Sequence, residues 1–173
     1  MNLYFMRHGV AVPADDITVT VDNERPLTNK GVKRMRRAAR GLRRLDIPFD
    51  SILTSPVLRA RQTAEIVAAA LGMEARLEEV SVLAPDSTVE HLLFGLTRYQ
   101  DREHILLVGH EPLLSQTMSS LLCGGRGQEI EIKVRKGSIC WIEIDALPPP
   151  GPGTLHWFIA PKQLRLMGER AKN

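Results

Sequence analysis

The chain lacks the features that place many proteins in a membrane or outside the cell. No apolar run in its 173 residues approaches the length needed to span a bilayer, and the amino terminus has no charged-then-apolar signal pattern. Cysteine is scarce, and the two that are present, Cys123 and Cys140, do not have the spacing of a metal site. We therefore expect free thiols, a cytoplasmic location and no membrane partner.

Acidic residues are missing from one long stretch, although the chain as a whole has a net charge of only +3. Residues 30–44 contain eight lysines and arginines and no aspartate or glutamate. Apolar residues at helical spacing predict one buried stripe here, formed by Val32, Met35, Ala39, Leu42 and Leu45. Most of the cations should then face water, either as an ordinary solvated helix face or as a docking surface for an acidic protein. Nucleic-acid binding is not expected, because no aromatic residues alternate with these cations and no known binding module is present.

The length and composition favour one compact unit. A chain of 173 residues with 43% hydrophobic content can bury one substantial core but is too short for two ordinary domains. We expect a single domain over residues 1–173, and a monomer. Apolar runs alternate with helical patterns, which predicts an α/β fold: a three-layer sandwich with a mostly parallel central sheet and helices on both faces. Residues 130–134 and 139–144 predict two late strands, whose hairpin adds an antiparallel edge.

The most informative segment is a short apolar run that ends at Arg7, His8 and Gly9. Such a run is typical of a buried strand, and the glycine is typical of a chain that turns sharply off the sheet. At the carboxyl end of the strand, where α/β sheets usually hold ligands, a permanent cation stands beside an imidazole that can lose its proton. The pair indicates a nucleophile that handles an anion.

A second junction of this kind contains Arg59. Residues 51–54 predict a short strand, followed by Ser55 as a helix N-cap and Pro56 at the first helical position. Arg59 then falls in the first helical turn, close to unpaired backbone N–H groups. A phosphate at this place would meet a guanidinium group and backbone donors together.

A third junction contains His110. Residues 105–108 predict a strand that ends at Gly109 and His110, with Pro112 opening the next helix. Since the carboxyl ends of parallel strands meet at one edge of a sheet, the three junctions should bring four side chains together. These are Arg7, His8, Arg59 and His110.

Four motifs in this order resemble the histidine phosphatase superfamily and, within it, the SixA-type phosphohistidine phosphatases. They are Arg7-His8-Gly9, Arg25-Pro26-Leu27-Thr28 with Gly31, Ser55-Pro56 through Arg59-Ala60 to Gln62-Thr63-Ala64, and Gly109-His110. The resemblance runs from about residue 3 to about residue 122. It implies a phosphatase with the α/β fold expected above.

The resemblance also implies a role for each charged side chain. Neutral His8 attacks phosphorus and becomes a phosphohistidine, which water then hydrolyses. Arg7 and Arg59 hold the phosphoryl oxygens, and a protonated or donating His110 contacts the same group. Arg25 is placed to reach the phosphate from the long loop 10–27, which should border the site. No metal and no cofactor are expected, because these cations already offset the charge of the transition state.

One departure from the superfamily narrows the substrate. Members that cleave phosphate esters usually carry an asparagine shortly after Arg-His-Gly and an acid that protonates the leaving oxygen. Residues 10–14 contain no asparagine, and residues 78–85 do not match the acid-bearing motif. A phosphohistidine depends less on such an acid, because the conjugate acid of its leaving imidazole has a pKa of about 6.5. We therefore expect a phosphohistidine-bearing protein as the partner and substrate, and the basic stretch favours an acidic one.

Two alternatives stay open. A small-metabolite phosphomonoesterase would need a carboxylic acid, for which the candidates are Asp15, Asp16, Glu79, Asp86 and Glu111. A phosphoprotein-binding module would use the same cations without forming a covalent intermediate, although an intact His8 argues against it.

Overall fold

The fold is built on one six-stranded sheet with the strand order β3-β2-β4-β1-β5-β6. The computed structural model describes residues 1–15, 21–125, 127 and 129–169. The strands are β1 (Asn2–Arg7), β2 (Ser51–Thr54), β3 (Leu77–Glu79), β4 (His104–Gly109), β5 (Ile139–Glu143) and β6 (Thr154–Ile159). The first four strands are parallel, whereas β5 runs antiparallel to β1 and β6 antiparallel to β5.

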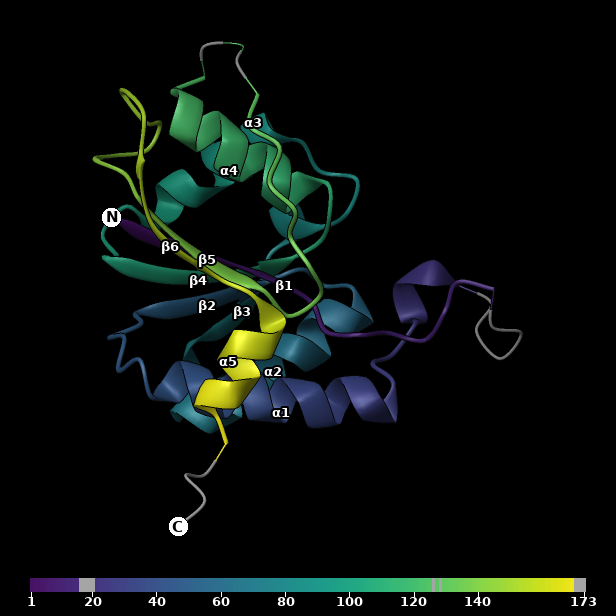
Figure 1. The fold of residues 1–173 in the computed structure, drawn as a ribbon. Coiled ribbons are helices and arrows are strands. Elements are labelled where there is room, and N and C mark those ends of the chain that lie inside the picture. Colours follow the sequence, from purple (N-terminus) through teal and green to yellow (C-terminus); the bar gives the residue numbers. More distant parts are fainter. Residues whose placement is uncertain (16–20, 126, 128, 170–173) are drawn as a thin grey trace.

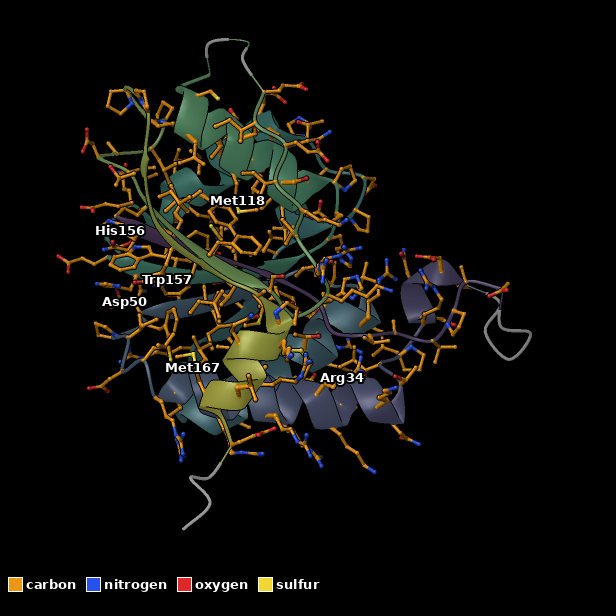
Figure 2. The ribbon with its side chains drawn as sticks, in the orientation of Figure 1. Arg34, Asp50, Met118, His156, Trp157 and Met167 are labelled. Carbon is orange, nitrogen blue, oxygen red and sulfur yellow. The ribbon has the colours of Figure 1, made fainter. Side chains whose placement is uncertain are left out.

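Helices cover both faces of this sheet (Figure 1). One layer contains α1 (Asn29–Arg43), α2 (Leu58–Leu71) and α5 (Pro161–Met167), and the other contains α3 (Val89–Leu96) and α4 (Leu113–Cys123). Side chains of a strand point alternately to its two faces, so Tyr4 of β1 packs in the first layer and Phe5 in the second. Figure 2 shows the same division for Trp157, on the side of the first layer, and for Met118 of α4, in the second layer. The predicted three-layer α/β sandwich is confirmed.

The basic stretch forms helix α1 as predicted. Thr28 is its N-cap, with a hydroxyl that accepts a hydrogen bond from the Gly31 N–H at 2.9 Å. Met35, Ala39 and Leu42 of the predicted stripe are buried. A side chain at Gly41 would place its Cβ 2.0 Å from the Leu164 carbonyl oxygen, so glycine allows α1 and α5 to pack this closely. Among the helices of the described residues, none combines the length and apolar character needed to cross a membrane.

The prediction of a strand at residues 130–134 is wrong. The Ile130 N–H donates to the Ser119 hydroxyl of α4, and the Val134 carbonyl accepts from Arg7, so these backbone groups are used outside the sheet. The late hairpin instead joins β5 to β6, and it places the antiparallel edge on the other side of β1 from β4. The short edge strand β3 was not predicted. It is only three residues long, which gives too little pattern to identify.

Candidate active site

The strand register brings the three predicted junctions together. Arg7 pairs with Gly109 at the ends of β1 and β4, and the next residue, His8, donates its backbone N–H to the Gly109 carbonyl at 3.1 Å. On the other side of β4, the Ser55 N–H donates to the Val108 carbonyl at 3.0 Å. The carboxyl ends of β1, β4 and β2 therefore lie side by side. We call Arg7, His8, Arg59 and His110 the strand-end cluster.

His8 is held as a neutral imidazole with one nitrogen free. His8 is 5% exposed, and its Nδ1 lies 2.7 Å from the carbonyl oxygen of the next residue, Gly9. Burial lowers the pKa of His8 to about 3, and the hydrogen bond to Gly9 offsets this only in part. Because a carbonyl can only accept, Nδ1 carries the proton and the lone pair is on Nε2. At neutral pH, His8 thus has the protonation state of a nucleophile.

His110 lies beside His8, with the two ring centroids 5.0 Å apart. Its Nε2 is 2.9 Å from the Ser55 hydroxyl, whereas its enclosed Nδ1 has no hydrogen-bond partner among the described residues. Burial, and next the positive charge of Arg59, lower the pKa of His110 to about 4. Of the two predicted states of His110, protonated or donating, this lowered pKa favours the donating one at neutral pH. A neutral imidazole still has one N–H, so His110 keeps the ability to donate.

Ser55 differs from its predicted role as a helix N-cap. Helix α2 begins at Leu58, with Val57 as its N-cap, so the helix starts two residues later than predicted. The Ser55 hydroxyl accepts from the Val57 N–H at 3.2 Å and contacts His110, which makes it a positioning group for that ring. Arg59 nevertheless lies in the first turn of α2, as predicted.

The two arginines of the strand-end cluster each keep an unused donor. Arg7 donates through one terminal nitrogen to the Val134 carbonyl at 2.7 Å, and Arg59 donates to the Asp22 carbonyl at 2.9 Å. The Nε of each guanidinium group is enclosed and has no acceptor within the described part of the chain. Buried donors are rarely left unpaired. An oxyanion between the two side chains would provide the missing acceptors.

Asp22 was missed by the sequence analysis. Its carboxylate contacts both Arg59, at 3.1 Å, and Arg25, whose Nε lies 2.8 Å from Oδ1. Arg25 also donates to the Val12 carbonyl at 2.9 Å, which fixes it on the loop beside Arg59. The loop therefore borders the site, as predicted. A lone aspartate in a loop with several acidic residues gave no signal of this contact.

Thr63 links the chain after His8 to helix α2. Its hydroxyl accepts from the Gly9 N–H at 3.0 Å and donates to the Arg59 carbonyl at 2.7 Å. The preceding Gln62 accepts from the Leu27 N–H at 2.7 Å through its Oε1. The Gln-Thr pair of the third motif thus ties both ends of the loop between β1 and α1 to helix α2.

The carboxylates predicted as candidate proton donors lie in different parts of the molecule. Glu79 lies 3.6 Å from Arg61, Asp86 lines a hollow of about 250 Å³ elsewhere, and Asp15 is exposed. Asp16 lies outside the described residues. Glu111 is the described candidate that acts on the strand-end cluster. Its negative charge acts on Arg7, and its Oε1 is enclosed without a partner in the described structure.

Other places in the molecule offer less for a phosphate. In the described residues, histidine, cysteine and acidic side chains do not gather into a group of three that could hold a metal ion. A hollow of about 720 Å³ lies between α3, α4 and the chain after α4, and its charged lining residues are Glu90, Glu129 and Glu131. These carboxylates would repel a phosphoryl group.

Comparisons with known proteins agree with the geometry. Residues 3–82 match the model of the histidine phosphatase superfamily (branch 1). An uncharacterized protein of Picosynechococcus sp. is 41% identical over 136 residues, which cover 77% of this chain and 80% of that protein. Phosphohistidine phosphatase SixA of Escherichia coli K12 is 29% identical over 169 residues, which cover 96% of this chain and 98% of SixA.

A solved structure gives the same result in three dimensions. The structure of the protein histidine phosphatase SixA complexed with tungstate superposes with a TM-score of 0.79 at 28% identity, and the match covers 95% of this chain and 99% of that one.

Proposed function

Because this chain belongs to the histidine phosphatase superfamily, branch 1, we propose that it is a metal-independent phosphohistidine phosphatase with His8 as its nucleophile. The observation that carries the proposal is the state of His8: a buried, neutral imidazole with Nε2 free beside two guanidinium groups with unused donors. A phosphoryl group placed there is both polarised and within reach of a nucleophile.

The proposed reaction has two steps. Nε2 of His8 forms a bond to phosphorus while the bond from phosphorus to the substrate imidazole breaks. Arg7 and Arg59 bind the equatorial oxygens, which carry the charge of the transition state, and His110 donates to one of them through a ring N–H. Water then attacks the phosphohistidine and releases phosphate together with neutral His8. Arg25 adds positive charge beside Arg59.

The leaving group distinguishes this proposal from its main alternative. Of the candidate carboxylates that the structure describes, Glu111 is the one whose charge acts on Arg7, and its enclosed Oε1 has no partner among the described residues, so it is the candidate proton donor. If Glu111 protonates leaving oxygens, the protein is a phosphomonoesterase for a small metabolite. The similarity to SixA over nearly the whole chain favours phosphohistidine.

The partner we propose is an acidic phosphoprotein. Seven of the eight cations in residues 30–44 are exposed, and the eighth, Arg34, lies on α1 beside α5 (Figure 2). The start of α1 is tied to the site, because the Thr28 N–H donates to the Val10 carbonyl, two residues after His8, at 2.9 Å. A cytoplasmic location fits the two free thiols, Cys123 and Cys140.

The test compares wild type with His8→Ala on a histidine-phosphorylated protein and a serine-phosphorylated peptide, without added metal. We expect rapid loss of phosphate from histidine, no loss with His8→Ala, and acid-labile label trapped on His8 after quenching with denaturant. His91→Ala, an exposed histidine of α3, is the matched control and should behave as wild type. Equal turnover of phosphoserine would instead establish a phosphomonoesterase. Binding without covalent label would establish a phosphoprotein-binding module.

A further inference from the structure

We infer that Asp22 recognises the leaving group: its carboxylate accepts a hydrogen bond from the ring N–H of the phosphorylated substrate histidine and thereby favours cleavage of N–P over O–P bonds. The inference rests on the proposed function and extends it to the specificity of the site. Its starting point is an acidic side chain placed where an anionic substrate has to bind.

Asp22 lies directly against the strand-end cluster. Both its carboxylate and its backbone carbonyl contact the same terminal nitrogen of Arg59, at 3.1 and 2.9 Å. Its charge also reaches His110, where it opposes the lowering of that pKa by burial and by Arg59. A phosphoryl group bound by Arg59 and His110 therefore has the Asp22 carboxylate as a neighbour.

Asp22 lies on the solvent side of this cluster. Its side chain is 56% exposed, whereas the side chain of Arg59 is 7% exposed and His8 is buried. In-line attack by His8 expels the leaving group on the side opposite the nucleophile. Since His8 is at the buried end, the leaving group points toward solvent, where Asp22 is found. Oδ1 of Asp22 already accepts two N–H groups of Arg25, whereas Oδ2 accepts one of Arg59 and keeps a lone pair for the leaving group.

The chemistry of phosphohistidine gives this carboxylate a use. One ring nitrogen is bonded to phosphorus, and the other can carry a proton. When it does, the electrons of the broken P–N bond return to a ring that leaves as neutral imidazole instead of imidazolate. The proton stays on the far nitrogen throughout, and a carboxylate that accepts this N–H stabilises the reactive form.

A phosphate ester gains nothing from the same carboxylate. Its leaving oxygen has no N–H to donate and becomes more negative as the bond breaks, so Asp22 repels it. Asp22 is also unsuited to act as a proton donor. Partial burial raises its pKa, but the hydrogen bonds and positive charges of Arg25 and Arg59 outweigh this and hold the pKa below its usual value.

The experiment measures kcat/KM of wild type and Asp22→Asn on a histidine-phosphorylated peptide and on p-nitrophenyl phosphate, an ester whose good leaving group needs no acid. We expect Asp22→Asn to lose about 10-fold or more on phosphohistidine, the scale of one hydrogen bond to a charged group. Turnover of the ester should stay unchanged or rise. On phosphohistidine, the alkaline fall in kcat/KM should move to lower pH, because the protonated ring is no longer stabilised.

Glu24→Gln is the matched control. It removes the same charge from the same short helix, η1 (Asp22–Glu24), at an exposed side chain, and should leave both substrates unaffected. Equal losses on both substrates with Asp22→Asn would mean that Asp22 only orients Arg59 and Arg25, which overturns the inference. An unchanged phosphohistidine rate would overturn it as well. A wild type that turns over the ester but not phosphohistidine would contradict the proposed function itself, before any variant is compared.

Discussion

The strand-end cluster and the charged segment 22–44, which holds Asp22, Arg25 and the cations of α1, are both rich in positive charge but are held by different means. His8, Arg59 and His110 are buried, and their positions follow from strand register and from hydrogen bonds to Gly9, Asp22 and Ser55. Most cations of α1 are exposed, and the contacts that the described residues show for Arg37, Arg40 and Arg44 are with Met167, Gly168 and Glu169 at and just after the end of α5.

Because of this difference in burial, the charges of the two regions differ in strength, range and sensitivity to salt. Buried charges act through a low effective dielectric over a few ångströms, and salt screens them little. Exposed charges act weakly at each site, but their summed field extends about a Debye length, roughly 8–10 Å at physiological salt. We propose that the strand-end cluster determines the reaction, while the charged segment 22–44 affects which phosphorylated molecule arrives and leaves.

The largest loss of activity is expected from Arg59→Ala, which tests the role proposed for the strand-end cluster. The variant removes a buried donor to the phosphoryl group, so kcat/KM should fall about 10²–10³-fold on both phosphohistidine and p-nitrophenyl phosphate. Arg61→Ala is the control, because Arg61 lies one half-turn further along α2, is 40% exposed and pairs with Glu65 and Glu79. A loss confined to phosphohistidine would contradict the division, since Arg59 would then act on the leaving group and not on the phosphate.

The second prediction concerns stability and involves the cluster alone. His8 and His110 have pKa values of about 3 and 4 in the folded protein, compared with 6.5 when the chain is unfolded. Between these values the unfolded chain binds more protons, so the free energy of unfolding should fall as the pH drops below 6.5. At pH 5 we expect the free energy of unfolding to be lower than at pH 7.5 by about 1–2 kcal/mol for each of these two histidines.

Urea unfolding at pH 7.5 and pH 5.0 checks this prediction. His110→Gln should show a smaller acid-induced loss than wild type, because it removes one of the two buried histidines. His91→Gln, at an exposed position of α3, should keep the wild-type loss. The same acid-induced loss in His110→Gln and wild type would show that the buried imidazoles are not the source.

The sequence was sufficient to predict the strand-end cluster, because its positions depend on local patterns. Short apolar runs ending in Arg7, His8 and His110 identify strands, and parallel strands bring their carboxyl ends to one edge. The layers of the sandwich follow from the same alternation of strands and helices.

What could not be predicted depends on contacts between distant segments. Asp22 meets Arg59 only because the loop after β1 folds back over the start of α2, 37 residues further along the chain. Residues 130–134 have the composition of a strand, but the Val134 carbonyl is taken by Arg7, 127 residues away. The Ser55 hydroxyl contacts His110 as well as the Val57 N–H, and helix α2 begins only at Leu58. In each case a tertiary hydrogen bond outweighs the local preference.

The smallest effect on activity is expected from changes to the exposed cations of α1. Reversing two exposed cations of α1, as Lys30→Glu with Lys33→Glu, removes attraction for an acidic carrier without touching the strand-end cluster. We expect kcat/KM on an acidic phosphohistidine peptide to fall about 3- to 10-fold at low salt, mainly through slower association, and to approach the wild-type value at high salt. Turnover of p-nitrophenyl phosphate should not change.

Arg98→Glu with Arg102→Glu is the control for this prediction, because it reverses exposed charges near the end of α3, in the other layer of the sandwich. If both variants slow the acidic peptide equally, only net charge matters and α1 is an ordinary solvated helix face. If a neutral phosphohistidine peptide loses as much as the acidic one, the reversed charges act on the phosphate itself, and the separation between cluster and segment is wrong. A loss of kcat/KM that is confined to the acidic peptide and abolished by salt would identify α1 as the docking surface. The reversed charges would then act on the acidic part of the substrate and not on its phosphoryl group.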